Sequence, residues 1–116
     1  LSGGQRQRVF IAMALAQNTK ILFLDEPTTY LDIRYQLDIL RLVKKLNREY
    51  GITIVMVLHE INQAIHFSDE VIGLKDGKVL VQGDPKDVIT TESISELYDV
   101  HLNVADIDGQ KFVLTV

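Results

Sequence analysis

Apolar and polar positions along the chain fall into a pattern that predicts a strand, a long helix and a second strand. Residues 21–24 and 52–58 are almost wholly apolar and rich in strand-forming residue types, so each predicts a strand buried on both faces of a sheet. Between them, residues 33–49 carry apolar side chains at the spacing of one helix face. A strand, a helix and a strand in this order predict neighbouring parallel strands, and hence an α/β fold with flanking helices.

The segments on either side of this unit predict further helices. Residues 6–16 hold strong helix formers without an internal Gly or Pro, and Val9, Phe10, Met13, Leu15 and Ala16 predict that one side of this helix is buried. Residues 60–67 predict another helix, which directly follows the second strand. Helices therefore precede and follow the predicted sheet.

The carboxyl-terminal part of the chain predicts only small elements. These are a hairpin with its turn at Asp76-Gly77, short helices over residues 85–89 and 92–98, and two weak strands within residues 101–116. Asp84 is the predicted cap and Pro85 the first residue of the first short helix, and Thr91 is the predicted cap of the second. This part therefore predicts a β-hairpin and small helices beside the parallel sheet.

Length, charge and composition limit the possible classes of protein. At 116 residues the chain is one domain at most, and a net charge of −4 without a Lys/Arg cluster argues against binding to nucleic acid. The absence of cysteine excludes disulfides and thiolate metal sites, and no apolar run has the length of a membrane span. The chain begins with Leu1 and not with Met, so we expect a fragment of a longer protein.

Candidate catalytic residues follow the two predicted strands. Asp25 and Glu26 come directly after residues 21–24, and neighbouring side chains at a strand end point in different directions. One carboxylate could then hold a hard cation while the other orients or deprotonates a water molecule. His59 follows residues 52–58, so we expect it at the same edge of the sheet. The alternatives are a polar turn that closes a core strand, and a histidine with a structural role.

The first residues of the chain predict a place for phosphate. Ser2, Gly3, Gly4 and Gln5 precede the helix predicted over residues 6–16. They combine free backbone N–H groups, a hydroxyl and the positive end of a helix dipole, which together suit an anion. The alternative is a plain helix cap at Ser2, with the glycines forming the entry turn.

Taken together and in order, these features resemble the second half of an ATP-binding cassette (ABC) ATPase. The features are Leu1-Ser2-Gly3-Gly4-Gln5, the apolar strand with Asp25-Glu26, Asp32 in the following turn, and His59 after the next strand. The resemblance implies that Asp25 holds the Mg²⁺ shell, that Glu26 is the general base for the attacking water, and that His59 reaches the γ-phosphate.

The same resemblance assigns the remaining residues to contacts between subunits. Ser2, Gly3, Gly4 and Gln5 would form the family signature, which contacts ATP held by the other subunit of a homodimer, and Asp32 would belong to the loop that couples the subunits. The implied cofactors are ATP and Mg²⁺.

The resemblance also predicts which part of the fold is present. No Gly-x-x-x-x-Gly-Lys-Ser/Thr loop occurs in the 116 residues. We therefore expect residues 1–116 to be the C-terminal part of one nucleotide-binding domain, a partial P-loop NTPase (RecA-like) sheet without the phosphate-loop strand and without a complete second domain. The parent protein would be an ATPase, whereas the chain alone is expected to be inactive.

Short segments narrow the resemblance to one kind of transporter. Residues 28–36 and 57–64 look like those of ATPase subunits from bacterial iron–siderophore and cobalamin importers. This implies transmembrane permease subunits as partners, an indirect partnership with a substrate-binding protein, no nucleic acid, and a peripheral position at the cytoplasmic face of the cell membrane. The alternatives are a soluble ABC-type ATPase of DNA repair or translation, and a non-enzymatic interaction module.

Overall fold

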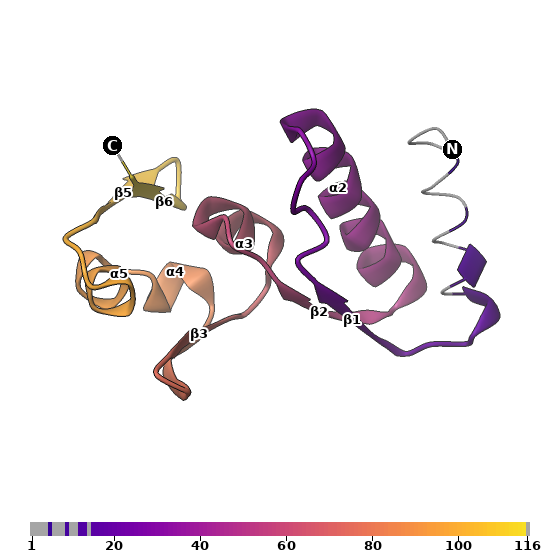
Figure 1. Ribbon diagram of the computed structural model, residues 1–116, viewed down its shortest axis with the longest axis horizontal. Coiled ribbons are helices and arrows are strands. Elements are labelled where there is room, and N and C mark those ends of the chain that lie inside the picture. Colours follow the sequence, from indigo (N-terminus) through magenta and orange to yellow (C-terminus); the bar gives the residue numbers. More distant parts are fainter. Residues whose placement is uncertain (1–4, 6–8, 10–11, 14, 116) are drawn as a thin grey trace. The chain divides into compact units, whose positions relative to one another are not determined.

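The computed structural model describes Gln5, Val9, residues 12–13 and residues 15–115, and the chain divides into two compact units, Leu1–His59 and Glu60–Val116 (Figure 1). Both units combine helices with small two-stranded sheets. The predicted α/β class is therefore confirmed.

The first unit contains the predicted strand, helix and strand. Strand β1 (Ile21–Asp25) pairs in parallel with β2 (Thr53–Val57), so that Ile21 lies opposite Thr53 and Asp25 opposite Val57. Helix α2 (Ile33–Tyr50) connects the two strands (Figure 1). The expected parallel pair is thus present, and both strands end at the same edge.

Helix α2 covers one face of this pair and ends at a defined stop. Leu46 of α2 and Ile52 are almost completely buried, and Leu22 of β1 and Ile54 of β2 pack against them. Gly51 takes a positive φ of 66° and donates its N–H to the carbonyl of Asn47, as expected for a glycine that ends a helix. The apolar stripe on α2 therefore forms the core of the first unit.

The prediction that both strands are buried on two faces is wrong for the described residues. Successive side chains alternate between the faces of a strand, and α2 contacts only the face that holds Leu22 and Ile54. On the other face Phe23 is 73% exposed and its register partner Val55 is 44% exposed. An uninterrupted apolar run cannot indicate that only one of its faces is covered.

The predicted helix before β1 is present in part of its length, but the described residues of its predicted buried side are exposed, and Phe10 of that side lies outside the described residues. Gln5, Val9, residues 12–13 and residues 15–16 are helical where the structure describes this segment. Val9, Met13 and Leu15 are 47%, 57% and 43% exposed. No other described element covers them, so their apolar character does not lead to burial here.

The second unit holds helix α3 and the small elements predicted for the carboxyl-terminal part. These are α3 (Ile61–Phe67), the antiparallel pair β3 (Val71–Lys75) and β4 (Lys78–Gly83), helices α4 (Pro85–Val88) and α5 (Thr91–Tyr98), and the antiparallel pair β5 (Asn103–Ile107) and β6 (Gln110–Leu114). Asp76 and Gly77 both have positive φ, 53° and 75°, which suits a tight hairpin turn. The predicted hairpin is therefore confirmed.

Helix caps in this unit agree with the sequence at one position and differ at another. Asp84 accepts the N–H of Lys86, and Pro85 is the first residue of α4, as predicted. Helix α5, however, is capped by Thr90 through a reciprocal pair of hydrogen bonds with Ser93. The hydroxyl of Thr91 instead accepts the N–H of Val104. The predicted cap was wrong by one residue, because this tertiary contact is invisible in the local sequence.

Side chains of α3 join the helix to the last hairpin. The Asn62 amide donates to the carbonyl of Val113 at 3.1 Å and accepts its N–H at 2.8 Å. Ile65, Ile89, Ile94 and Val113 form the buried core of this unit. Glu60 caps α3 by accepting the N–H groups of Asn62 and Gln63. Helix α3 is therefore fixed to β6 by polar as well as apolar contacts.

An ion pair fastens the hairpin of β3 and β4 to the end of α5. The Lys75 ammonium lies 2.6 Å from an Asp99 carboxylate oxygen and also donates to the carbonyl of Glu96. The hydrogen bond to Asp99 raises the pKa of Lys75 above its ordinary value.

Tyr98 is the last residue of α5. Partial burial raises the pKa of its phenol, and the negative charge of Glu60 adds to this effect.

Candidate functional site

The carboxyl ends of β1 and β2 bring Glu26 and His59 into direct contact. Glu26 follows β1, and its N–H donates to the carbonyl of Val57 at 2.9 Å, which extends the strand pairing by one residue. The His59 Nε2 atom lies 2.5 Å from Glu26 Oε1. The structure therefore places these two predicted residues at one edge of the sheet, as the strand order requires.

Both side chains of this pair are accessible to solvent. His59 is 73% exposed and Glu26 is 36% exposed. A carboxylate and an imidazole in contact at an open sheet edge can accept, hold and release protons, and each can reach a bound molecule. The pair is therefore suited to acid–base chemistry on a ligand from solvent.

The backbone at Glu26 has an unusual conformation that the sequence did not reveal. Glu26 has a positive φ of 51°, which is uncommon for a residue other than glycine, and the carbonyl of Glu26 accepts the N–H of Thr29 at 3.2 Å to close a tight turn. Such strain often accompanies functional positions. Pro27 disfavours a right-handed helical conformation at Glu26 but does not specify the left-handed one.

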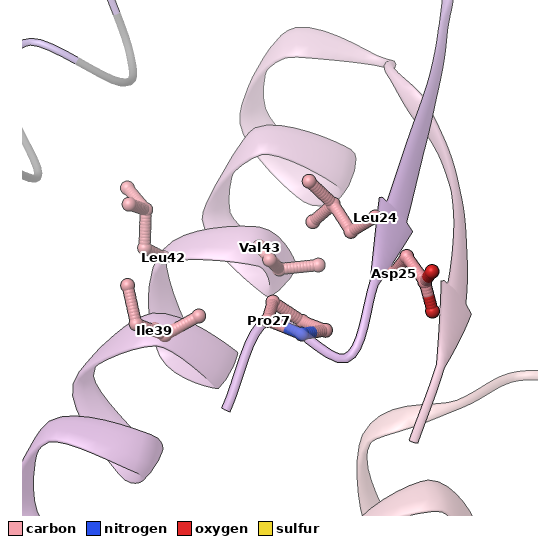
Figure 2. Close-up of a pocket in the computed structure, with 6 residues that line it drawn as sticks. All are labelled: Leu24, Asp25, Pro27, Ile39, Leu42 and Val43. Atoms are coloured by element: carbon pink, nitrogen blue, oxygen red, sulfur yellow. The ribbon is translucent and has the colours of Figure 1, made fainter. Parts of the chain in front are cut away.

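Asp25 lies beside an apolar hollow between the end of β1 and α2. The hollow has a volume of about 290 Å³, and its lining residues are Leu24, Asp25, Pro27, Ile39, Leu42 and Val43. Figure 2 shows the side chains of Leu24, Pro27 and Val43 near one another, with the Asp25 carboxylate pointing away from them. Such a lining does not suit a phosphate, so the hollow is not the predicted nucleotide site.

The chemistry of Asp25 fits Mg²⁺ bound together with a nucleotide. Among the described residues, no group of three or more His, Cys, Asp or Glu side chains could hold a metal ion. This excludes a cage built from these side chains within that part of the chain. Mg²⁺, however, typically takes one or two carboxylates and completes its shell with water and phosphate oxygens. The exposed carboxylate of Asp25 can supply one such ligand.

Asp32 lies directly before α2 and is not one of the two residues of the Glu26–His59 pair. It precedes α2 as the cap residue, yet its exposed side chain makes no capping hydrogen bond. The turn before it is held by other contacts, because the Gln36 amide donates to the carbonyl of Leu31 at 2.8 Å. The Asp32 carboxylate is therefore not used to cap its own helix.

The structure covers little of the predicted phosphate-binding segment. Gln5 is helical and exposed, whereas Ser2, Gly3 and Gly4 lie outside the described residues. The arrangement expected for these residues therefore stays a prediction.

Comparison with known proteins first indicates the class of protein that the chain resembles. The family model described as ABC transporter matches residues 1–29, a segment that includes Asp25 and Glu26. A solved inward-facing ABC transporter matches 97% of this chain and 45% of its own, with a TM-score of 0.77 and 30% identity. Over most of its length the chain is therefore similar to ABC transporter proteins.

Curated relatives within this class are named for the import of iron compounds. The chain is 51% identical over 106 residues to the ferric enterobactin transport ATP-binding protein FepC of Escherichia coli K12, which covers 91% of this chain and 39% of FepC. It is 51% identical over 104 residues to the iron(3+)-hydroxamate import ATP-binding protein FhuC of Bacillus subtilis 168, covering 90% of this chain and 39% of FhuC. The chain thus spans less than half the length of these relatives.

Among solved structures, the dimeric ATP-binding cassette MJ0796 bound to ADP and Pi also resembles the chain. It has a TM-score of 0.58 and 49% identity, and the match covers 73% of this chain and 36% of that one. In the described part of the chain, no helix is both long enough and apolar enough to span a membrane.

Proposed function

We propose that residues 1–116 are the C-terminal part of one nucleotide-binding domain in an ABC importer for ferric siderophores. The intact subunit would couple ATP binding and hydrolysis to transport. The observation that carries this proposal is the contact between Glu26 and His59 at the end of a parallel strand pair. The names of FepC and FhuC favour an iron importer over a soluble ATPase of DNA repair or translation, and over a non-enzymatic interaction module.

In this proposal the residues at the sheet edge divide the work of hydrolysis. Glu26 polarises the water that attacks the γ-phosphate, and His59, which is in contact with Glu26, reaches the same phosphate. Asp25 holds the Mg²⁺ shell, and the ion supplies neutralisation of the phosphate charge when bound. Phosphoryl transfer depends mainly on positioning and charge neutralisation, which these side chain types can provide.

The other proposed residues act between two copies of the subunit. Ser2, Gly3, Gly4 and Gln5 would contact ATP held by the second nucleotide-binding subunit of a homodimer. Asp32 would couple the two subunits, and its carboxylate is not used to cap α2. Further proposed partners are the transmembrane permease subunits and, indirectly, a substrate-binding protein. We accordingly propose a peripheral position at the cytoplasmic face of the cell membrane.

Replacing His59 with Ala tests the observation that carries the proposal. In an intact ATP-binding protein that contains this chain, we expect ATP turnover to fall about ten- to hundredfold, because a charge-assisted hydrogen bond contributes about 1.5–3 kcal/mol. Steady-state phosphate release and ATP affinity should be measured together. His59 is largely exposed, so folding should be unaffected.

His101→Ala is the matched control for this experiment. His101 is also exposed, and its ring contacts Asn103 in the second unit. Its replacement should leave turnover unchanged. Equal turnover in the His59→Ala, His101→Ala and unsubstituted proteins would overturn the role of His59.

The chain by itself is proposed to lack ATPase activity. The 116 residues contain no phosphate loop, which supplies the backbone cradle and the lysine for the β- and γ-phosphates in P-loop enzymes. Isothermal titration of the isolated chain with Mg-ATP should therefore give no binding in the micromolar range, and phosphate release should equal the rate without protein. Binding in that range, or turnover, would contradict this proposal.

A further inference from the structure

The Glu26 carboxylate has a different partner at each of its oxygen atoms. Oε1 lies 2.5 Å from His59 Nε2, and Oε2 accepts a hydrogen bond from the Thr29 hydroxyl over 3.5 Å. The second contact is longer than the usual distance of about 2.7–2.8 Å between hydroxyl and carboxylate oxygens. Contacts of catalytic groups often shorten when the ligand is bound. Both oxygens of Glu26 are thus held by side chains of the same unit.

Backbone hydrogen bonds also fix the position of the main chain from which this carboxylate extends. The Glu26 N–H donates to Val57, and its carbonyl accepts the N–H of Thr29, so both peptide groups of Glu26 are anchored. The positive φ of Glu26 is maintained by this turn. The backbone contacts do not fix the rotation of the carboxylate about the last side-chain torsion, whose angles have a broad distribution in Glu. A donor at the second oxygen is the group that would restrict this rotation.

We propose that Thr29 is a positioning residue that orients the Glu26 carboxylate through a hydrogen bond to Oε2. The inference rests on the proposed function, in which Glu26 polarises the attacking water. The hydroxyl and the imidazole together fix the orientation of the carboxylate plane, so the lone pairs that face the water have a defined direction. The turn that gives Glu26 its positive φ also brings Thr29 within reach, because the two residues are its ends.

Removing the hydroxyl while keeping the shape of the side chain tests this role. In an intact ATP-binding protein that contains this chain, Thr29→Val should lower kcat for ATP hydrolysis about three- to tenfold, as expected for one hydrogen bond. KM for ATP should be unchanged, because Thr29 orients the base and does not bind the nucleotide. Thr29→Ser keeps the hydroxyl and should restore kcat. Thr29→Ala lacks it, and provides the same test if the Val variant folds poorly.

Thr53→Val is the matched control, because Thr53 is exposed at the start of β2. It should leave kcat unchanged. An unchanged kcat in both Thr29→Val and Thr29→Ala would overturn the inference, as would a loss that Thr29→Ser does not restore.

A second pair of variants separates this inference from the proposed function. When Glu26 is already replaced by Gln, Thr29→Val should cause no further loss, because the base that it orients is gone. Full activity of the Glu26→Gln protein would remove the proposed base and with it the inference. Loss of activity in Glu26→Gln, together with normal kcat in both Thr29 variants without the hydroxyl, would overturn the role of Thr29 alone.

Discussion

Replacing Glu26 with Gln in an intact ATP-binding protein is expected to lower ATP hydrolysis by about two to four orders of magnitude. The amide keeps the size of the side chain but cannot accept a proton from the attacking water. Because the positive φ of Glu26 and the backbone contact with Val57 do not depend on the carboxylate, the turn should persist. ATP binding and ATP-dependent dimerisation should therefore be preserved.

Two measurements on the same protein check this expectation. Single-turnover phosphate release measures the chemical step, and light scattering with and without ATP measures dimerisation. Glu49→Gln is the control, because Glu49 is exposed near the end of α2 and should not affect either quantity. Hydrolysis at the normal rate in the Glu26→Gln protein would remove Glu26 as the base.

Replacing Leu46 with Ala is expected to lower the free energy of unfolding by about 2–5 kcal/mol. Leu46 is 0% exposed and belongs to the cluster with Ile52 that holds α2 against the strand pair. Removing its side chain loses apolar burial and leaves a cavity that the neighbours fill only in part. The helix that closes the first unit would be anchored less firmly as a result.

Urea denaturation followed by circular dichroism measures this loss. Ile33→Ala is the control: Ile33 begins α2 but is 64% exposed, so its replacement should change stability by less than about 0.5 kcal/mol. Similar losses in the two variants would show that α2 is not held through Leu46.

Local patterns were sufficient to predict the elements and the position of the candidate pair. Apolar runs on both sides of a helical stripe predict two parallel strands, and the residues after such strands meet at one edge. Glu26 and His59 are therefore in contact although 33 residues apart by their numbers. Turn residues gave the hairpin at Asp76-Gly77 in the same direct way.

The features that the sequence did not predict depend on particular contacts and backbone angles that residue types alone do not specify. The Thr90 cap differs from the prediction because Thr91 is used by Val104, and the bond between Thr29 and Glu26 depends on a turn whose φ no residue type specified. Burial was overestimated at Phe23 and Val9 because apolar character indicates which residues can be buried, and not which of them another element covers.

The paired hydrogen bonds between Asn62 and Val113 occupy part of the outer edge of β6 in the last hairpin. A side-chain amide has the same donor and acceptor as a peptide group, so at this position Asn62 imitates a third strand beside β6. Open strand edges invite pairing with other polypeptides. A single helical residue here blocks such strand addition at Val113, without requiring another strand in the fold.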